Sequence, residues 1–119
     1  MADDNDALAD IERQISKLES TATNLEMMST LAARAGQKDN SLQLADSAVD
    51  VRVQQFKLYR AKDKLQENSN EWKALTASLE VVNHFIDESL ADLGQIKNVL
   101  DSVSQLLAIA TKLLTVVGA

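Results

Sequence analysis

The stretch Trp72–Val117 reads WKALTASLEVVNHFIDESLADLGQIKNVLDSVSQLLAIATKLLTVV and carries an apolar stripe along its whole length. Alternating steps of three and four residues reach fourteen positions in it, and thirteen of these positions are apolar. Such sustained heptad spacing is typical of a helix that packs against other helices. It predicts that the chain is all-α. The fourteen positions are Trp72, Leu75, Leu79, Val82, Ile86, Ser89, Leu93, Ile96, Leu100, Val103, Leu107, Ala110, Leu114 and Val117.

Gly94 is the one glycine inside this stripe, and it decides how many helices the chain forms. The heptad phase is the same on both sides of Gly94, and an isolated glycine costs a helix only about 1 kcal/mol. We therefore favour a continuous third helix over residues 70–117, about 70 Å long and at most kinked at Gly94. A reversal at Gly94 would instead give a closed four-helix bundle.

A first helix over about residues 4–35 is predicted from a second apolar stripe upstream. Acidic residues at its start complement the positive end of the helix dipole. Gly36 is suited to a left-handed residue that ends this helix, and residues 37–39 form a short polar loop. The stripe consists of Leu8, Ile11, Ile15, Leu18, Ala22 and Leu25.

A second helix over about residues 41–67 is predicted to begin at a capping box formed by Asn40 and Gln43. Asn68 and Glu71 are placed to cap the third helix in the same way. The predicted architecture is a single all-helical domain of residues 1–119. It is an elongated bundle or coiled coil in which an antiparallel hairpin packs against a long third helix.

The second helix has two apolar faces, which predicts that it lies between two neighbours. One face holds Leu42, Ala45, Val49, Val53 and Phe56, and the opposite face holds Leu44, Ala48, Val51, Leu58 and Leu65. A strand is the competing interpretation of residues 49–53, where valines alternate with polar residues. No turn signal flanks that stretch, so we favour the helix.

The distribution of charge favours the antiparallel hairpin. Residues 1–36 hold seven acids and three bases, whereas bases gather at the end of the second helix. These two ends lie side by side in an antiparallel pair, so opposite charges meet there. The alternative is a solvated helix end whose bases complement the helix dipole. The bases are Lys57, Arg60, Lys62 and Lys64.

Composition narrows the class of protein further. The 119 residues include no proline, no cysteine and three glycines, which favours helices and excludes disulfides and thiolate chemistry. The formal charge of −6 argues against nucleic acid as the main partner. The acidic N-terminus is unlike a signal peptide, and no uncharged apolar run is long enough to span a bilayer. We expect a cytoplasmic protein, with secretion by a signal-less route left open.

Side chains that could support chemistry are few. His84 is the only histidine, and Glu80, His84 and Glu88 share one side of a helix that flanks the apolar stripe. A di-iron bundle needs paired Glu-x-x-His motifs facing inward, and this chain has none. No glycine-rich phosphate loop is present either. We expect no catalytic residue, no metal site and no cofactor.

The C-terminal segment is the predicted interaction surface. Between Leu106 and Ala119 the only polar side chains are Thr111, Lys112 and Thr115, so apolar residues cover more than half of the helix circumference. A monomeric bundle needs one apolar face on each helix, which leaves surplus apolar surface for another chain. The predicted interface residues are Val99, Leu100, Val103, Leu106, Leu107, Ile109, Leu113, Leu114, Val116 and Val117.

The expected function is therefore non-enzymatic assembly through this helix, either with itself as a homo-oligomer or with a helical protein partner. One alternative is a membrane-active or lipid-surface-binding protein, such as a pore-forming component or a coat. The low content of lysine in the segment speaks against it, because surface-seeking helices are usually rich in basic residues. A second alternative is a small acidic chaperone or adaptor, which differs only in the identity of its partner.

Overall fold

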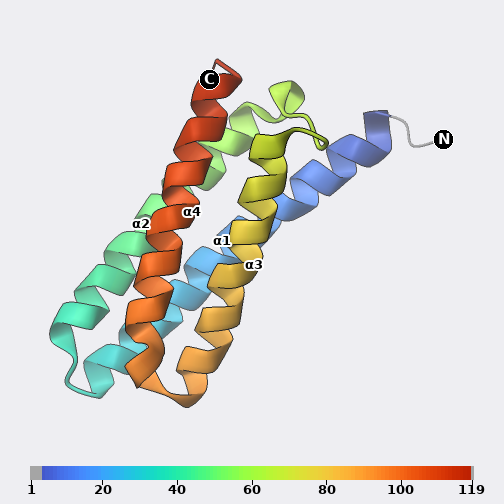
Figure 1. Cartoon of the computed structure of the whole chain (residues 1–119). Coiled ribbons are helices and arrows are strands. Elements are labelled where there is room, and N and C mark those ends of the chain that lie inside the picture. The colour runs from blue at the N-terminus through green and yellow to red at the C-terminus, as the bar shows by residue number, and fades with distance from the viewer. Residues whose placement is uncertain (1–3, 119) are drawn as a thin grey trace.

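The computed structural model describes residues 4–118 and shows four helices in an up-down-up-down bundle (Figure 1). The all-α prediction is confirmed, since residues 4–118 contain no strand and the alternating valines of residues 49–53 lie in a helix. The elements are α1 (Asp4–Arg34), α2 (Lys38–Arg60), the short 3-10 helix η1 (Lys62–Lys64), α3 (Asn70–Ala91), the 3-10 helix η2 (Leu93–Gln95) and α4 (Ile96–Val116).

Two antiparallel hairpins make up the bundle. Helix α1 pairs with α2 and α3 pairs with α4, while α2 also packs on α4 and α1 on α3. Figure 1 shows the α1–α2 and α3–α4 turns at one end of the bundle and the connection between α2 and α3 at the other. The principal extents are 51 × 26 × 18 Å.

All four helices contribute to one continuous apolar core. The stripe predicted for α1 is buried from Ile11 to Leu25, and only Leu8 at its start is half-buried. In α3 every predicted heptad position from Trp72 to Ser89 is buried. Burying an apolar side chain contributes about 1.5–3 kcal/mol, so these spaced positions supply most of the driving force for packing.

The favoured continuous third helix is wrong, because the chain reverses between α3 and α4. Helix α3 ends at Ala91, and Asp92 adopts an extended conformation (φ −148°, ψ 102°). The Asp92 carboxylate accepts a hydrogen bond of 2.9 Å from the Gly94 N–H, and the Asp92 carbonyl accepts one of 3.0 Å from the Gln95 N–H. The turn thus satisfies backbone groups that a helix end leaves free.

The buried face of α4 differs from the one predicted by continuing the α3 stripe. Leu100 and Leu107 are only half-buried, whereas Val99 and Leu106 have almost no exposed surface. Once the chain has reversed, the phase of α3 no longer determines the rotation of α4. Its contacts with α2 and α3 do so instead.

The end of α1 follows the prediction. Gly36 has a φ of +80°, in the left-handed region that glycine adopts without steric cost. The Gln37 N–H donates to the Ala32 carbonyl at 2.8 Å, and the Gly36 N–H donates to the Ala33 carbonyl at 3.1 Å. These two bonds form the Schellman motif that commonly ends a helix at glycine.

The predicted boundaries of the second helix and the start of the third need correction. Helix α2 begins at Lys38 with no side-chain cap, so the predicted capping box does not open it. It ends at Arg60 rather than near residue 67, because η1 and the extended Leu65 lead the chain across the end of the bundle. The cap of α3 is Ser69, whose hydroxyl accepts a hydrogen bond of 3.2 Å from the Trp72 N–H.

One polar contact joins the two hairpins inside the seam between α1 and α3. Thr21 is buried, and its hydroxyl lies 2.8 Å from the Lys17 carbonyl and 3.0 Å from Asn83 Oδ1. The contact with Asn83 forms in one alignment of the two helices, whereas the contact with Lys17 lies within α1 and does not depend on that alignment.

Spin labels on Lys73 and Thr115 test the reversal. Both residues are exposed, and they lie in the first turn of α3 and the last turn of α4. Neighbouring antiparallel helices are about 8–10 Å apart, so the two labels should lie within about 25 Å of each other. A continuous helix would separate them by about 63 Å. Pulsed electron paramagnetic resonance distinguishes these distances, and a distribution centred near 60 Å would contradict the reversal.

Candidate interaction surface

Helix α2 exposes one of its two apolar faces. Leu44, Ala48, Val51 and Leu58 face the core, as predicted. The opposite face holds Leu42, Val49, Val53 and Phe56, with exposed fractions of 65%, 59%, 44% and 58%. We call these four residues the α2 stripe. Helix α2 does contact two neighbours, α1 and α4, but no helix within residues 4–118 covers the α2 stripe, so the expectation that both apolar faces are buried is wrong.

The α2 stripe is flanked by charges that divide the helix into two halves. Asp39, Asp46 and Asp50 lie in the N-terminal half, and Lys57 and Arg60 lie in the C-terminal half. All five side chains are exposed, and none has an ion-pair partner within 4 Å among the described residues. The Arg60 guanidinium lies 5.7 Å from the centre of the Phe56 ring, so a cation also borders the apolar end of the stripe.

The basic end of the hairpin meets α1 as the charge distribution predicts. Lys62 Nζ lies 3.3 Å from Glu12 Oε2 and 4.2 Å from the centre of the Tyr59 ring. Interaction with Tyr59, reinforced by the Glu12 carboxylate, raises the pKa of Lys62 above its usual value. Lys62 therefore forms an ion pair within the chain, whereas Lys57 and Arg60 form none within 4 Å among the described residues. A shallow hollow beside it is lined by Lys57, Arg60, Ala61, Lys64 and Leu114.

The residues predicted as the partner interface occupy different environments in the bundle. Most belong to the core, where they contact other helices of the same chain, and only one is exposed. An interface made of the whole set would therefore require α4 to leave the bundle. The buried members are Val99, Val103, Leu106, Leu113 and Leu114, the half-buried members are Leu100, Leu107, Ile109 and Val117, and the exposed member is Val116.

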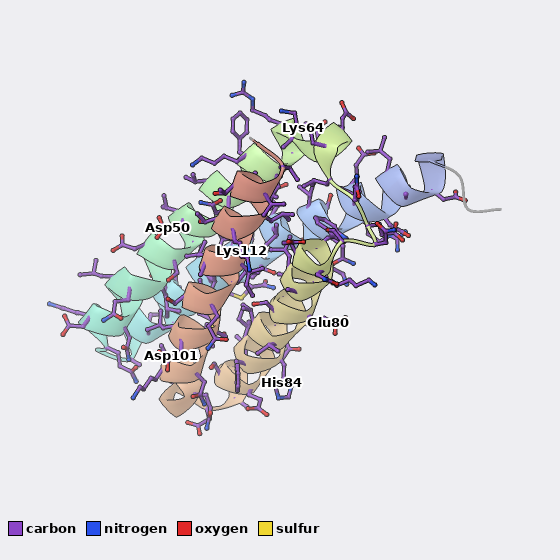
Figure 2. The ribbon with its side chains drawn as sticks, turned by 45° about the horizontal axis from the view of Figure 1, so that its top comes forward. Asp50, Lys64, Glu80, His84, Asp101 and Lys112 are labelled. Carbon is purple, nitrogen blue, oxygen red and sulfur yellow. The ribbon has the colours of Figure 1, made fainter. Side chains whose placement is uncertain are left out.

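Titratable side chains on α3 face solvent. Figure 2 shows Glu80 and His84 projecting from the outside of this helix. His84 Nε2 lies 3.1 Å from Glu88 Oε1, in an exposed pair one helical turn apart. Across residues 4–118 no three His, Asp or Glu side chains are grouped closely enough to hold a metal ion.

The segment Leu93–Val116 meets the length and composition criteria for a membrane-spanning helix. Core helices of soluble proteins meet the same criteria, because burial in a protein and burial in lipid select the same apolar residues. Its charged side chains include Asp101 and Lys112, which lie on the exposed side of α4 and are labelled in Figure 2.

Sequence reasoning recognised the apolar character of the α2 stripe but placed it inside the protein. Charged residues could have distinguished the exposed face of α2 from the buried one. Acids and bases border the exposed face, whereas mainly neutral residues border the buried face. No protein-family model, curated protein or solved structure matches the chain, so its function is argued from this surface.

Proposed function

We propose that this chain is a non-enzymatic interaction protein that binds a protein helix, its own or a partner's, through the α2 stripe. The observation that supports the proposal is the row of four large apolar side chains left exposed on an otherwise packed helix. The row extends from Leu42 to Phe56, about 21 Å along the helix, which matches three to four turns of a partner helix.

We place the binding surface at the α2 stripe instead of the C-terminal segment, because a partner can bind the α2 stripe while the bundle stays closed. Exposing Leu106 or Leu113 would remove those side chains from the core, at about 2–5 kcal/mol for each. Binding at the α2 stripe carries no such cost. Burial of about 300 Å² of apolar area would contribute roughly 7 kcal/mol before the cost of association.

Charge favours a protein over a lipid surface as the partner of the α2 stripe. Helices that lie on membranes usually have a basic polar face, which anionic lipids attract. The flank of the α2 stripe carries three aspartates in addition to its bases, and the whole chain has a charge of −6. An adaptor or chaperone role would use the same stripe and differ only in the partner bound.

A photoreactive benzoylphenylalanine in place of Val53 tests the proposal in cells that express the protein. Val53 lies in the α2 stripe, and Ala77 is a matched control because it is exposed on α3. We expect adducts of defined mass from position 53, at least about 10-fold more abundant than from position 77. These adducts should disappear when Val49→Gln and Phe56→Gln are added, since the apolar contact is then lost.

Equal adduct formation from positions 53 and 77 would overturn the proposed function. Adducts that persist in the glutamine variant would do the same, because they would not depend on the stripe. Thermal melting of both variants shows whether the bundle is intact, and substitutions at exposed positions should change the free energy of unfolding by less than about 0.5 kcal/mol.

A further inference from the structure

We infer that the partner of the α2 stripe is an amphipathic helix of another protein, and that this helix is acidic at the end that lies over Arg60. The inference rests on the proposed function and specifies the chemistry of its partner. It is supported by three cations that gather where the α2 stripe ends. They line a shallow apolar hollow, and none of them is paired with an acid of residues 4–118.

The three cations surround apolar side chains at one end of the bundle. We call this site the basic hollow, and it is lined by Lys57, Arg60, Ala61, Lys64 and Leu114. Ala61 and Leu114 are almost fully buried and form its floor, whereas the three cations are exposed. Figure 2 labels Lys64 at this end of the bundle. The basic hollow therefore offers apolar contact and positive charge in one place, which suits the end of an amphipathic helix.

The α2 stripe leads directly into the basic hollow. With about 100° between successive residues, Arg60 lies within about 40° of every residue of the α2 stripe, about one turn beyond Phe56. Its guanidinium is 5.7 Å from the centre of the Phe56 ring, so the cation adjoins the apolar face. Leu42 and Arg60 are about 27 Å apart along the helix. A partner helix that covers the α2 stripe therefore has its end over the basic hollow.

The charge of the basic hollow is not neutralised within the described chain. Residues 51–60 contain no acid, and Lys57, Arg60 and Lys64 have no carboxylate within 4 Å among residues 4–118. Like charges that share one small hollow repel one another, and a carboxylate from outside relieves this repulsion. The acids that stay beyond 4 Å at the same end of the bundle are Asp63, Glu67 and Glu71.

Two neighbouring bases have a structural role instead. Arg52 pairs with Glu26, and Lys62 pairs with Glu12 at 3.3 Å. Both pairs join the second half of the hairpin to α1, so they hold the two segments together. The cations of the basic hollow form no such pair, which leaves their charge available to a partner.

A second copy of α2 does not supply the acidic end. Because residues 51–60 contain bases and no acid, a parallel pair places the bases of one copy beside those of the other. An antiparallel pair centred on the α2 stripe places Arg60 opposite Lys38. It also brings Asp46 and Asp50 of both copies together, and like charges across an interface oppose association. The charges therefore favour a different chain.

A lipid surface fits these charges less well than a helix does. A flat anionic membrane would contact the whole exposed side of α2, where Asp39, Asp46 and Asp50 repel it. A helix is only about 10–12 Å wide, so it can cover the α2 stripe and present carboxylates at one end alone. The mixed flank of α2 therefore selects a partner whose own charge is uneven.

Synthetic helical peptides test the inference. Three peptides of about 18 residues share a leucine face with the spacing of the α2 stripe and differ beside that face. One carries glutamates in its first turn, one carries them in its last turn, and the third carries glutamines in both. We expect one acidic peptide to bind the full chain at least about 10-fold more tightly than the glutamine peptide, as measured by fluorescence anisotropy. The acidic peptide that binds more tightly gives the direction of the partner helix.

Removing the cations should abolish this preference. In the variant Lys57→Gln, Arg60→Gln, Lys64→Gln the acidic and glutamine peptides should bind within about 2-fold of each other. In the variant Lys57→Glu, Arg60→Glu, Lys64→Glu the acidic peptide should bind more weakly than the glutamine peptide. Thermal melting of both variants separates loss of recognition from loss of the fold.

A matched control makes the same change in net charge away from the α2 stripe. Lys17→Glu, Lys73→Glu and Lys97→Glu lie on α1, α3 and α4, at exposed side chains with no ion pair within 4 Å among residues 4–118. The control should keep the preference for the acidic peptide to within about 3-fold, because distant surface charges are largely screened at physiological salt. A loss as large as that in the basic-hollow variants would assign the preference to net charge and overturn the inference.

The inference and the proposed function fail in different ways. Equal binding of the acidic and glutamine peptides, or no binding of any peptide at about 500 µM, would overturn the inference alone. Adducts from position 53 would still test the proposed function. Phosphatidylglycerol vesicles that bind the wild-type chain and not the glutamine variant would assign the cations to a lipid surface and overturn the inference too. A preference that depends on the basic hollow, with binding that Val49→Gln and Phe56→Gln weaken, supports both.

Discussion

Replacing Leu106 with alanine is expected to lower the free energy of unfolding by about 2–5 kcal/mol. Leu106 is 1% exposed and lies in the core that α4 shares with its neighbours. The truncation removes apolar contacts and leaves a cavity that helices on all sides can fill only in part. A domain of this size unfolds with about 5–15 kcal/mol, so the loss is a large fraction of the total.

Chemical denaturation of the Leu106→Ala variant, followed by circular dichroism, measures this loss. Leu90→Ala is the matched control, because the same chemical change occurs at a side chain that is 50% exposed. The control should change the free energy of unfolding by less than about 1 kcal/mol. If Leu106→Ala were as mild as the control, while weakening association, Leu106 would belong to an interface between chains as the sequence alone suggested.

Replacing both Asp92 and Gly94 with alanine is expected to produce a domain-swapped dimer. Removing the Asp92 cap costs the turn about 1 kcal/mol, and alanine in place of Gly94 favours a continuous helix by about 1 kcal/mol more. A Cβ at position 94 would also lie 3.1 Å from Asp92 Oδ1 in the wild-type turn. The spacing by three and four residues continues through position 94, so a fused helix would keep Ile96, Val103 and Ala110 on the face that carries the α3 stripe.

The swapped dimer restores every core contact, because α4 of each chain packs on the hairpin of the other. Both chains must open, so the equilibrium shifts by about 4 kcal/mol, or roughly a thousandfold. Labels on Lys73 and Thr115 should then report about 63 Å within one chain. A double variant that retains the short distance would show that packing against α2, and not the turn, holds α4 in place.

The helical class and most of the core were predictable because burial follows a local period. Ile15 and Leu25 in α1, and Leu79 in α3, lie on stripes that three-and-four spacing identifies without knowledge of the partner helix. The reversal at Asp92 was not predictable in this way. The Asp92 cap and the cost of Gly94 in a helix both favour a turn, but by only about 1 kcal/mol each, which is small beside the burial of the α4 side chains. Packing of α4 against α2 and α3 decides between a turn and a continuous helix.

The interaction surface was harder to predict than the fold, because the sequence of an apolar helix face does not show whether another helix of the same chain covers it. Helix α4 is apolar over much of its circumference because both α2 and α3 contact it. Its additional apolar surface is therefore buried within the chain. Helix α2 has two separated apolar faces, and the face with Val49 and Phe56 faces solvent. Which face is covered depends on the closed arrangement of four helices, a property of the whole bundle and not of any segment.

Two hairpins built from leucine, isoleucine and alanine could slide past each other by one helical turn with little loss of buried area. Such slippage would give several compact states of similar energy, as in poorly specified helical designs. The hydroxyl of Thr21 meets Asn83 in only one of these alignments. A displaced alignment would lose this contact, at about 0.5–1.5 kcal/mol, although the Thr21 hydroxyl would keep the Lys17 carbonyl of its own helix. The contact between Thr21 and Asn83 therefore biases the bundle toward one alignment among near-equivalent apolar packings.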